Sequence, residues 1–196
     1  MPTAPFRPFD DLLDRDAALT QLRAAVAGAD DGELFLERRR SEVLSFDDGR
    51  VKTASYDAAE GFGLRAVRGD TAGYAHSTTI DEQALRRAVA TARLAVGSGG
   101  GTLAAGPAGT NRKLYPDTDP MEQATFPAKI DILREIDAFA RGLDKRVVQV
   151  SVSLAASLQE VAILRPEGTL VTDIRPMSRL NISVIVEQNG QREGGH

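Results

Sequence analysis

The sequence contains no cysteine and no tryptophan, and only two of its 196 residues are histidine. Without cysteine the chain can form no disulfide, no thiolate nucleophile and no cysteine-ligated metal site. Histidine supplies most metal ligands and most general bases near neutral pH. We expect His76 to be a solvent-facing or hydrogen-bonded residue near a strand end, and His196 to be a frayed last residue. The sequence therefore assigns no catalytic, cofactor-binding or metal-binding residue.

Long apolar runs and a basic charge balance are also missing. No run approaches the length of a membrane span, and residues 1–15 contain no apolar core of a secretory signal. We therefore expect neither a secretory signal nor a membrane span, and the absence of cysteine suits a reducing cytoplasm. The net charge of -4 disfavours nucleic-acid binding. The one basic run, Arg38-Arg39-Arg40, is flanked by acids, so we interpret it as a solvated strand, with a phosphate-binding patch as the alternative.

The composition is that of an ordinary folded protein, with 42% hydrophobic and 27% charged residues. Apolar residues at helical spacing predict helices over 10–28, after Thr79, and from Pro127 onward. Thr79 and Glu82 have the spacing of a capping box. The residues expected on the buried faces of the second and third helices are Leu85, Val89, Ala92 and Val96, and Ile132, Ile136, Phe139 and Leu143.

Alternating patterns predict four strands after the first helix and four after the third. Asp48-Gly49, Glu167-Gly168 and Asn189-Gly190 mark hairpin turns. The segment SEVLSFDDGRVKT resembles QEVAILRPEGTLVT, which suggests a duplicated helix-plus-meander unit. We predict an α+β fold in two layers, with a mostly antiparallel sheet and helices on one face. Its parts would be about 1–98 and 126–196, joined by a Gly/Pro-rich connector over 97–126.

One short stretch fits a dinucleotide-binding pattern. Gly61, Gly63 and Ala66 match G-x-G-x-x-G/A, and Asp81 follows at the distance of a ribose-binding acid. That fingerprint requires a helix to begin inside the motif, whereas this segment alternates like a strand. We therefore interpret the glycines as a bulge or a tightly packed strand, and Asp81 as a first-turn helix acid. The tripeptide Arg68-Gly69-Asp70 reads as a hairpin turn, not as an adhesion motif.

The remaining acidic pairs predict turns. Asp30-Asp31 and Asp47-Asp48 sit where Asp is favoured for its backbone hydrogen bonds. Asp117 and Asp119 could suggest a cation site, but the further oxygen ligands of calcium are missing. No serine nucleophile motif is present.

Four segments resemble the TldD/PmbA family: GFGLRAVRGDTAGYAHS, KLYPDTDP, KIDILREIDAFARGLDKRVVQVSVSL and DIRPMSRLNISVIVEQNGQREGG. The resemblance runs with gaps from about residue 10 to the end, and it leans toward the TldD branch. It implies the N-terminal domain of a cytoplasmic zinc metallopeptidase that cleaves unfolded or extended peptides, of the group formerly called modulators of DNA gyrase. It also implies a PmbA/TldE-like partner subunit or a homodimer.

The zinc and its histidine–glutamate motif would lie in a C-terminal catalytic domain that is absent from these residues. Only six residues follow Asn189-Gly190, so we expect a fragment that is inert alone and that contributes chamber walls and assembly contacts. The alternatives are a non-catalytic module that binds a partner through an exposed sheet edge, and a gyrase-binding protein. The sequence identifies no substrate-binding residue.

Overall fold

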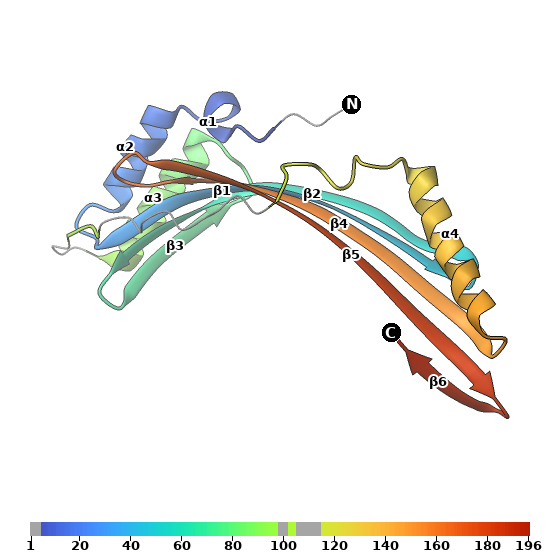
Figure 1. Ribbon diagram of the computed structural model, residues 1–196. Helices are drawn as coiled ribbons and strands as arrows, with labels where there is room; N and C mark the ends of the chain where they lie inside the picture. Colours follow the sequence, from blue (N-terminus) through green and yellow to red (C-terminus); the bar gives the residue numbers. More distant parts are fainter. Residues whose placement is uncertain (1–4, 98–101, 105–114) are drawn as a thin grey trace. The chain divides into compact units, whose positions relative to one another are not determined.

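The computed structural model describes residues 5–97, 102–104 and 115–196 (Figure 1). Its elements are α1 (Pro8–Asp11), α2 (Arg15–Ala25), β1 (Asp31–Asp47), β2 (Arg50–Arg68), β3 (Thr71–Ser77), α3 (Glu82–Val96), α4 (Phe126–Leu143), β4 (Val147–Leu164), β5 (Leu170–Gln188) and β6 (Gln191–Gly195). The six strands form one antiparallel sheet in the order β3-β2-β1-β4-β5-β6. This confirms the predicted α+β class.

The strand order is symmetric about the central β1–β4 pair. A helix followed by the meander β1-β2-β3 is matched by α4 followed by the meander β4-β5-β6. The two segments that resemble each other in sequence form the β1–β2 and β4–β5 turns, which occupy equivalent places in the two meanders. The topology is thus the one that the predicted duplication requires.

The prediction of four strands in each half was wrong, because the strands are longer than expected. β2 runs for 19 residues through Gly61 and Gly63 without a break. β5 also has 19 residues and includes Pro176. β6 pairs with 184–188 of β5, so Pro176 lies outside that pairing, on a stretch of the strand with one free edge, where proline is tolerated. Each half therefore has three strands.

The three predicted hairpin turns are confirmed. Asp48 and Gly49 have φ angles of 48° and 77°, and Asn189 and Gly190 have 53° and 78°. Two successive positive φ angles characterise the turn that best joins twisted antiparallel strands. Gly168 has φ 98° in the turn between β4 and β5.

Two helix starts differ from prediction, for the same reason. The single helix expected over 10–28 is divided, because Asp14 is an extended N-cap whose carboxylate accepts the Ala17 N–H at 2.7 Å. At α3 the cap is Asp81, which accepts the Ala84 N–H at 2.6 Å. Thr79 is therefore not the cap, and Asp81 is not a first-turn acid. In both places an Asp side chain replaces a backbone acceptor at the helix start.

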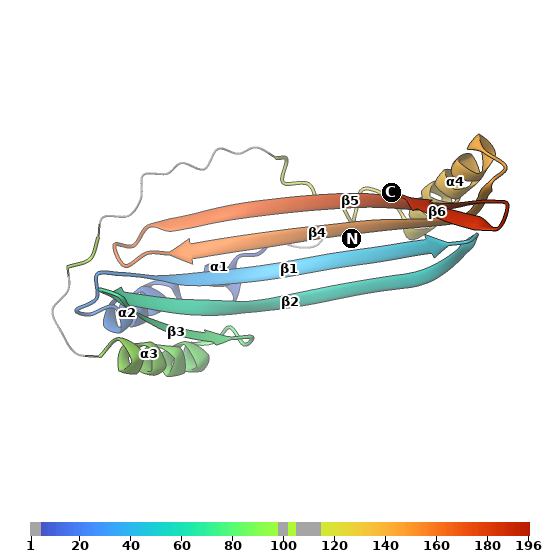
Figure 2. The same ribbon diagram turned by 90° about the horizontal axis from the view of Figure 1, so that it is seen from below.

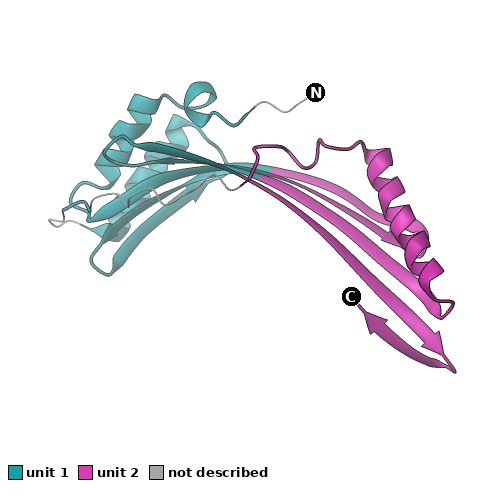
Figure 3. Ribbon diagram, viewed as in Figure 1, with its two compact units in different colours: residues 1–39, 59–114, 159–174 teal, residues 40–58, 115–158, 175–196 magenta. Residues whose placement is uncertain are grey.

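The chain divides into two compact units, coloured in Figure 3. Unit 1 comprises 1–39, 59–114 and 159–174, and unit 2 comprises 40–58, 115–158 and 175–196. β1, β2, β4 and β5 each contribute to both units. The predicted subdivision at a connector over 97–126 stays a prediction, and residues 98–101 and 105–114 of that connector lie outside the described residues.

Each unit has its own apolar core between helices and one face of its part of the sheet. In unit 1, Leu22 of α2 and Leu85 of α3 pack with the strand residues Leu34, Leu36 and Leu64. All five are at most 1% exposed, and full burial of each such side chain contributes about 1.5–3 kcal/mol. The expected buried face of α3 is confirmed.

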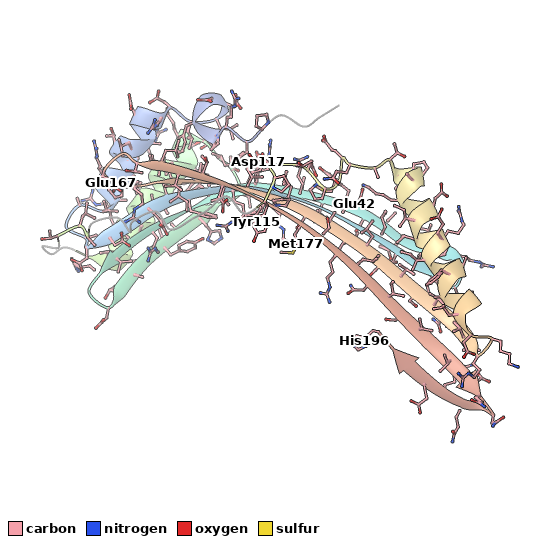
Figure 4. The ribbon with its side chains drawn as sticks, viewed as in Figure 1. Glu42, Tyr115, Asp117, Glu167, Met177 and His196 are labelled. Carbon is pink, nitrogen blue, oxygen red and sulfur yellow. The ribbon has the colours of Figure 1, made fainter. Side chains whose placement is uncertain are left out.

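Unit 2 is built around α4, whose predicted buried face was right at Ile136, which packs against the core, but wrong at Ile132, Phe139 and Leu143, which are exposed. Phe139 and Leu143 are each 70% exposed, whereas Leu133 is fully buried against β1 and β4. The buried face also carries Lys129, whose Nζ donates to Glu42 Oε1 of β1 at 2.6 Å and to the Met121 carbonyl at 2.7 Å. Figure 4 labels Glu42 among the side chains of the sheet. Because the ammonium group has two acceptors, one of them a carboxylate, Lys129 can be buried on this face of the helix.

Candidate functional site

Two hollows of unit 1 meet at strand β3. The first, of about 340 Å³, lies between β3 and α3, and we call it the β3–α3 groove. It is lined by Tyr74, Ala75, His76 and Ser77 of β3 and by Ala84, Arg87, Ala88 and Thr91 of α3. Figure 2 shows α3 running alongside β3 at the outer side of the sheet. The groove therefore combines a sheet edge with a helix face.

The second hollow, of about 260 Å³, is lined by residues of β1, β2 and β3, among them Tyr74 and His76 of β3. Its other lining residues include Phe35, Glu37 and Arg39 of β1 and the segment 59–63 of β2. Tyr74 and His76 border both hollows, and their rings stack with centroids 5.7 Å apart. His76 is exposed, as predicted.

The glycines of the dinucleotide-like motif serve close packing in a strand. A Cβ on Gly63 would lie 2.7 Å from the Tyr74 hydroxyl oxygen, and one on Gly61 would lie 2.6 Å from the Ser77 carbonyl oxygen. Both glycines belong to β2, which continues into a hairpin instead of a helix. The interpretation as a tightly packed strand is confirmed, and the geometry for cradling a pyrophosphate at a helix N-terminus is not formed here.

Arg68-Gly69-Asp70 forms the β2–β3 turn, as predicted. Gly69 has φ 53°, and its N–H donates to the Asp30 carboxylate at 2.6 Å. Asp30 thereby ties this turn to the start of β1, which confirms its structural role.

Asp31 belongs to a network of alternating charge that joins β1, β2 and Arg165, the residue that follows β4. Arg165 contacts Asp31 at 2.7 Å and Glu33 at 3.3 Å, and Arg65 contacts the same two acids at 3.0 and 3.2 Å. Burial alone would raise the pKa of Asp31. The Arg165 and Gly32 hydrogen bonds and the two arginine charges outweigh burial, so the pKa lies below its ordinary value. The network ties β1 to β2 and to the end of β4, and both of its acids are paired with arginine.

The other acidic pairs are also structural. Asp47 accepts hydrogen bonds from Ser151 Oγ at 2.6 Å and Gln149 Nε2 at 3.0 Å, and these bonds lower its pKa. Asp48 pairs with Arg141 beside the β1–β2 turn. Asp119 contacts Arg40 at 3.0 Å and accepts the Met121 N–H at 2.8 Å. A turn begins at Asp119, as predicted, because the Glu122 N–H donates to the Asp119 carbonyl oxygen at 3.3 Å.

The basic run is not a solvated strand, because β1 is central in the sheet. Arg40 is only 6% exposed and pairs with Asp119 in unit 2. In unit 1, Arg38 pairs with buried Glu160 at 2.9 Å, and its guanidinium lies 5.4 Å from the Phe6 ring centroid. Only Arg39 is exposed. The run therefore fails as a phosphate patch as well, since two of its three cations are used inside the fold.

Within the described ranges, no three His, Asp or Glu side chains gather closely enough to hold a metal ion. In the same part of the chain, no helix combines the length and apolar character that a membrane crossing requires.

Sequence reasoning missed the residues of the β3–α3 groove. Arg87 and Thr91 lie on the same helix face as Ala84 and Ala88, which a periodicity argument assigns to the core. The one available signal was β3 itself, because its sequence TAGYAHS contains neither proline nor a charged side chain other than histidine. Nothing local in the sequence indicates that this strand ends the sheet.

Two family models match the chain. One describes "PmbA/TldA metallopeptidase domain 1" and matches 32–96, and the other describes "PmbA/TldA metallopeptidase central domain" and matches 119–196. Together they span more than two thirds of the chain.

Curated relatives carry the same family name. A "Metalloprotease TldD homolog" of Haemophilus influenzae is 36% identical over 169 residues, which is 85% of this chain. One of Buchnera aphidicola subsp. Acyrthosiphon pisum is 31% identical over 183 residues, or 93% of this chain. The chain spans only 35% and 38% of the length of these two relatives, respectively.

Solved structures share the fold at low sequence identity. TldE from Thermococcus kodakarensis superposes with a TM-score of 0.71 at 17% identity, over 91% of this chain and 41% of that one. A Thermotoga maritima protein, described as a proposed modulator of a DNA gyrase, gives 0.72 at 14% identity, over 93% and 41%. With the two family models and the named relatives, these matches show that the chain belongs to the PmbA/TldD metallopeptidase family and corresponds to the N-terminal part of its members.

Proposed function

We propose that this chain is the N-terminal, non-catalytic part of a TldD-like zinc metallopeptidase that cleaves unfolded or extended peptides. It would help to enclose the substrate and to assemble the oligomer, and it would be inert alone. The observation that carries the proposal is the pair of family-model matches, combined with relatives named metalloproteases of which this chain spans little more than a third. A cytoplasmic location belongs to the same proposal.

The geometry of the described residues favours a structural role for this part of the protein over a catalytic one. A metallopeptidase needs a Lewis-acidic metal and a carboxylate that activates water. The carboxylates Asp31, Glu33, Asp47 and Asp119 are instead occupied by arginines, hydroxyls and amides. What the described residues do offer is sheet surface and free strand edges.

Assembly with a PmbA/TldE-like subunit, or with a second copy, is the second part of the proposal. Exposed apolar side chains on α4, such as Phe139 and Leu143, supply surface of the kind that protein contacts cover. Mixing the purified chain with a TldE-type protein and measuring the mass of the mixture in solution tests this part. A mixture that shows only the two separate species would contradict it.

A cleavage assay tests inertness. The chain, with and without added zinc, is incubated with an unstructured fluorogenic peptide. We expect no cleavage above the rate with zinc alone. Cleavage that a chelator abolishes would refute the non-catalytic role.

A deletion in a longer relative tests the supporting role. The Haemophilus influenzae protein without the region matched here should keep its metal content but lose most of its peptide cleavage. Unchanged cleavage by that deletion variant would show that the region does not serve the reaction.

A protein-interaction module remains the second candidate, and the free edge of β3 is the observation that favours it. Strand addition to a sheet edge is a common way to bind extended chains. The two candidates differ in whether the longer protein needs this region for cleavage.

A further inference from the structure

We propose that the β3–α3 groove binds an extended peptide segment with an acidic side chain, by adding the segment as a strand to the free edge of β3. The inference rests on the proposed function in one respect, since handling of extended peptides makes such a segment the natural ligand. The site itself is argued from the edge, the groove and its charge.

β3 ends the sheet, and although α3 packs alongside it, its edge lacks the charged side chains and the proline that often protect an edge. Strand edges are commonly guarded by charged side chains, proline or bulges. The unpaired part of β5 contains Asp173, Arg175, Pro176 and Arg179, and the unpaired part of β2 contains Arg50, Lys52, Asp57 and Glu60. Among the edge segments of the described chain, β3 alone carries no proline and no Lys, Arg, Asp or Glu. It is therefore the edge best suited to accept another strand.

The backbone of β3 provides one side of a strand pairing. Its register with β2 runs without interruption from Phe62↔Ser77 to Arg68↔Thr71. In such a regular antiparallel ladder, every second residue directs its N–H and C=O away from the partner strand. These outward groups form a row that an extended peptide can pair with, and hydrogen bonds of this kind depend little on the peptide sequence.

The groove provides the other side. Ala84 and Ala88 leave room beside the strand because their side chains are small, and Arg87 and Thr91 border the same space. Its volume of about 340 Å³ lies at the lower end of the range of roughly 300–1,000 Å³ for ligand pockets. α3 is held firmly at this distance, since Gly73 lets the helix backbone at Ala92 approach β3 closely.

Charge selects the occupant. The ionisable side chains of the lining are Arg87, His76 and Tyr74, and none is a carboxylate. The neighbouring Arg86 pairs with Glu82 at 3.1 Å, whereas the guanidinium of Arg87 makes no ion pair with another described residue. In a chain of net charge -4, a groove with an available arginine favours an acidic side chain, because a carboxylate can form charge-assisted hydrogen bonds with it.

Peptide binding to the 196-residue chain tests the inference. A fluorescein-labelled peptide of about ten alternating Val and Thr residues carries one central Glu, and matched peptides carry Gln or Lys there. A fourth peptide has N-methyl groups on alternate amides, which block strand pairing and keep the side chains. Anisotropy should show the Glu peptide binding about tenfold tighter than the Gln peptide, with no binding of the Lys and N-methylated peptides.

Two matched arginine substitutions locate the contact. Arg87→Gln should weaken binding of the Glu peptide about tenfold, whereas Arg86→Gln on the next position of the helix should change it less than about twofold. Arg87→Glu should reverse the preference toward the Lys peptide. Circular dichroism verifies that each variant is folded. Equal binding of the Glu and Gln peptides, or equal effects of the two Gln substitutions, would overturn the proposal.

Hydrogen exchange gives an independent readout. With saturating Glu peptide, amide exchange in 71–77 should slow, while 50–57 of β2 should not change. Protection confined to other strands would refute the site. Competition by free glutamate at the same concentration as the peptide would also refute it, because that result indicates a simple anion site. A dimer of the chain that Arg87→Gln disrupts would refute it too, because the occupant would then be a second copy. Cleavage is not measured, so failure here leaves the peptidase proposal standing.

Discussion

Gly73 of β3 lies so close to Ala92 of α3 that a Cβ on Gly73 would overlap the Ala92 carbonyl oxygen. Backbone cannot rotate away as a side chain can, so Gly73→Ala must push α3 from the sheet. Overpacking of this kind costs about 1–3 kcal/mol. We expect Gly73→Ala to lower the free energy of unfolding by that amount in chemical denaturation.

Two other glycines provide the controls for Gly73. Gly63→Ala meets mainly the ring of Tyr74, which is 60% exposed and can move, so we expect a smaller loss. Gly142→Ala lies in α4 with open space around it, and it should stabilise the chain by up to about 1 kcal/mol. A loss at Gly142 as large as at Gly73 would contradict the packing explanation.

The orientation of α4 can be tested with one substitution on each face. Leu133→Ala removes a fully buried side chain and should cost about 2–5 kcal/mol. Phe139→Ala removes a larger side chain that is 70% exposed and should change stability by less than about 0.5 kcal/mol. Urea titrations of both variants decide this. If Phe139→Ala were the more costly change, the helix would face the other way.

The arginine–carboxylate network of unit 1 should contribute measurably to stability. Arg165 is 12% exposed at its side chain and bridges Asp31 and Glu33. Arg165→Ala leaves both acids with Arg65 alone, and we expect a loss of about 1–3 kcal/mol. Arg134→Ala breaks the pair with Asp131, whose two side chains are at least 60% exposed, and should cost less than about 1 kcal/mol. Equal losses would show that burial is not what gives the network its strength.

The hydrogen bonds to Asp47 should make part of the stability depend on pH. Ser151 and Gln149 lower the pKa of Asp47 in the folded state below its ordinary value of 3.8. A lowered folded pKa stabilises the protein above the unfolded pKa, and that contribution is lost as the pH falls through the folded pKa. Asp47→Asn should therefore destabilise the chain at about pH 6 but much less at about pH 3.

Denaturation of both forms at these two pH values measures the effect at Asp47. Asp57→Asn, on an exposed part of β2, controls for the loss of one negative charge. A gap between wild type and Asp47→Asn that stays the same at both pH values would refute the linkage.

Patterns local in sequence predicted much of the fold. Positive φ at Asp48-Gly49 and Asn189-Gly190 follows from residue types that accept it, so these hairpins were foreseeable. The alternation over 62–67 correctly excluded a pyrophosphate loop. The same approach failed for strand number, because glycines inside a strand look like breaks until their neighbours are known.

The sequence by itself determined the α+β class, the hairpin turns, the family, and the scarcity of histidine and cysteine, since each depends on residue type or short-range spacing. Only the tertiary structure decided which face of α4 is buried, that Arg38 and Arg40 pair inside the fold, and that β3 is an edge beside α3. These features depend on partners far apart in the chain: Lys129 finds Glu42, Arg38 finds Glu160, and no strand follows β3 in the sheet order of the described residues. Periodicity reports which side chains can share a face, but the packing of distant segments decides which face is covered.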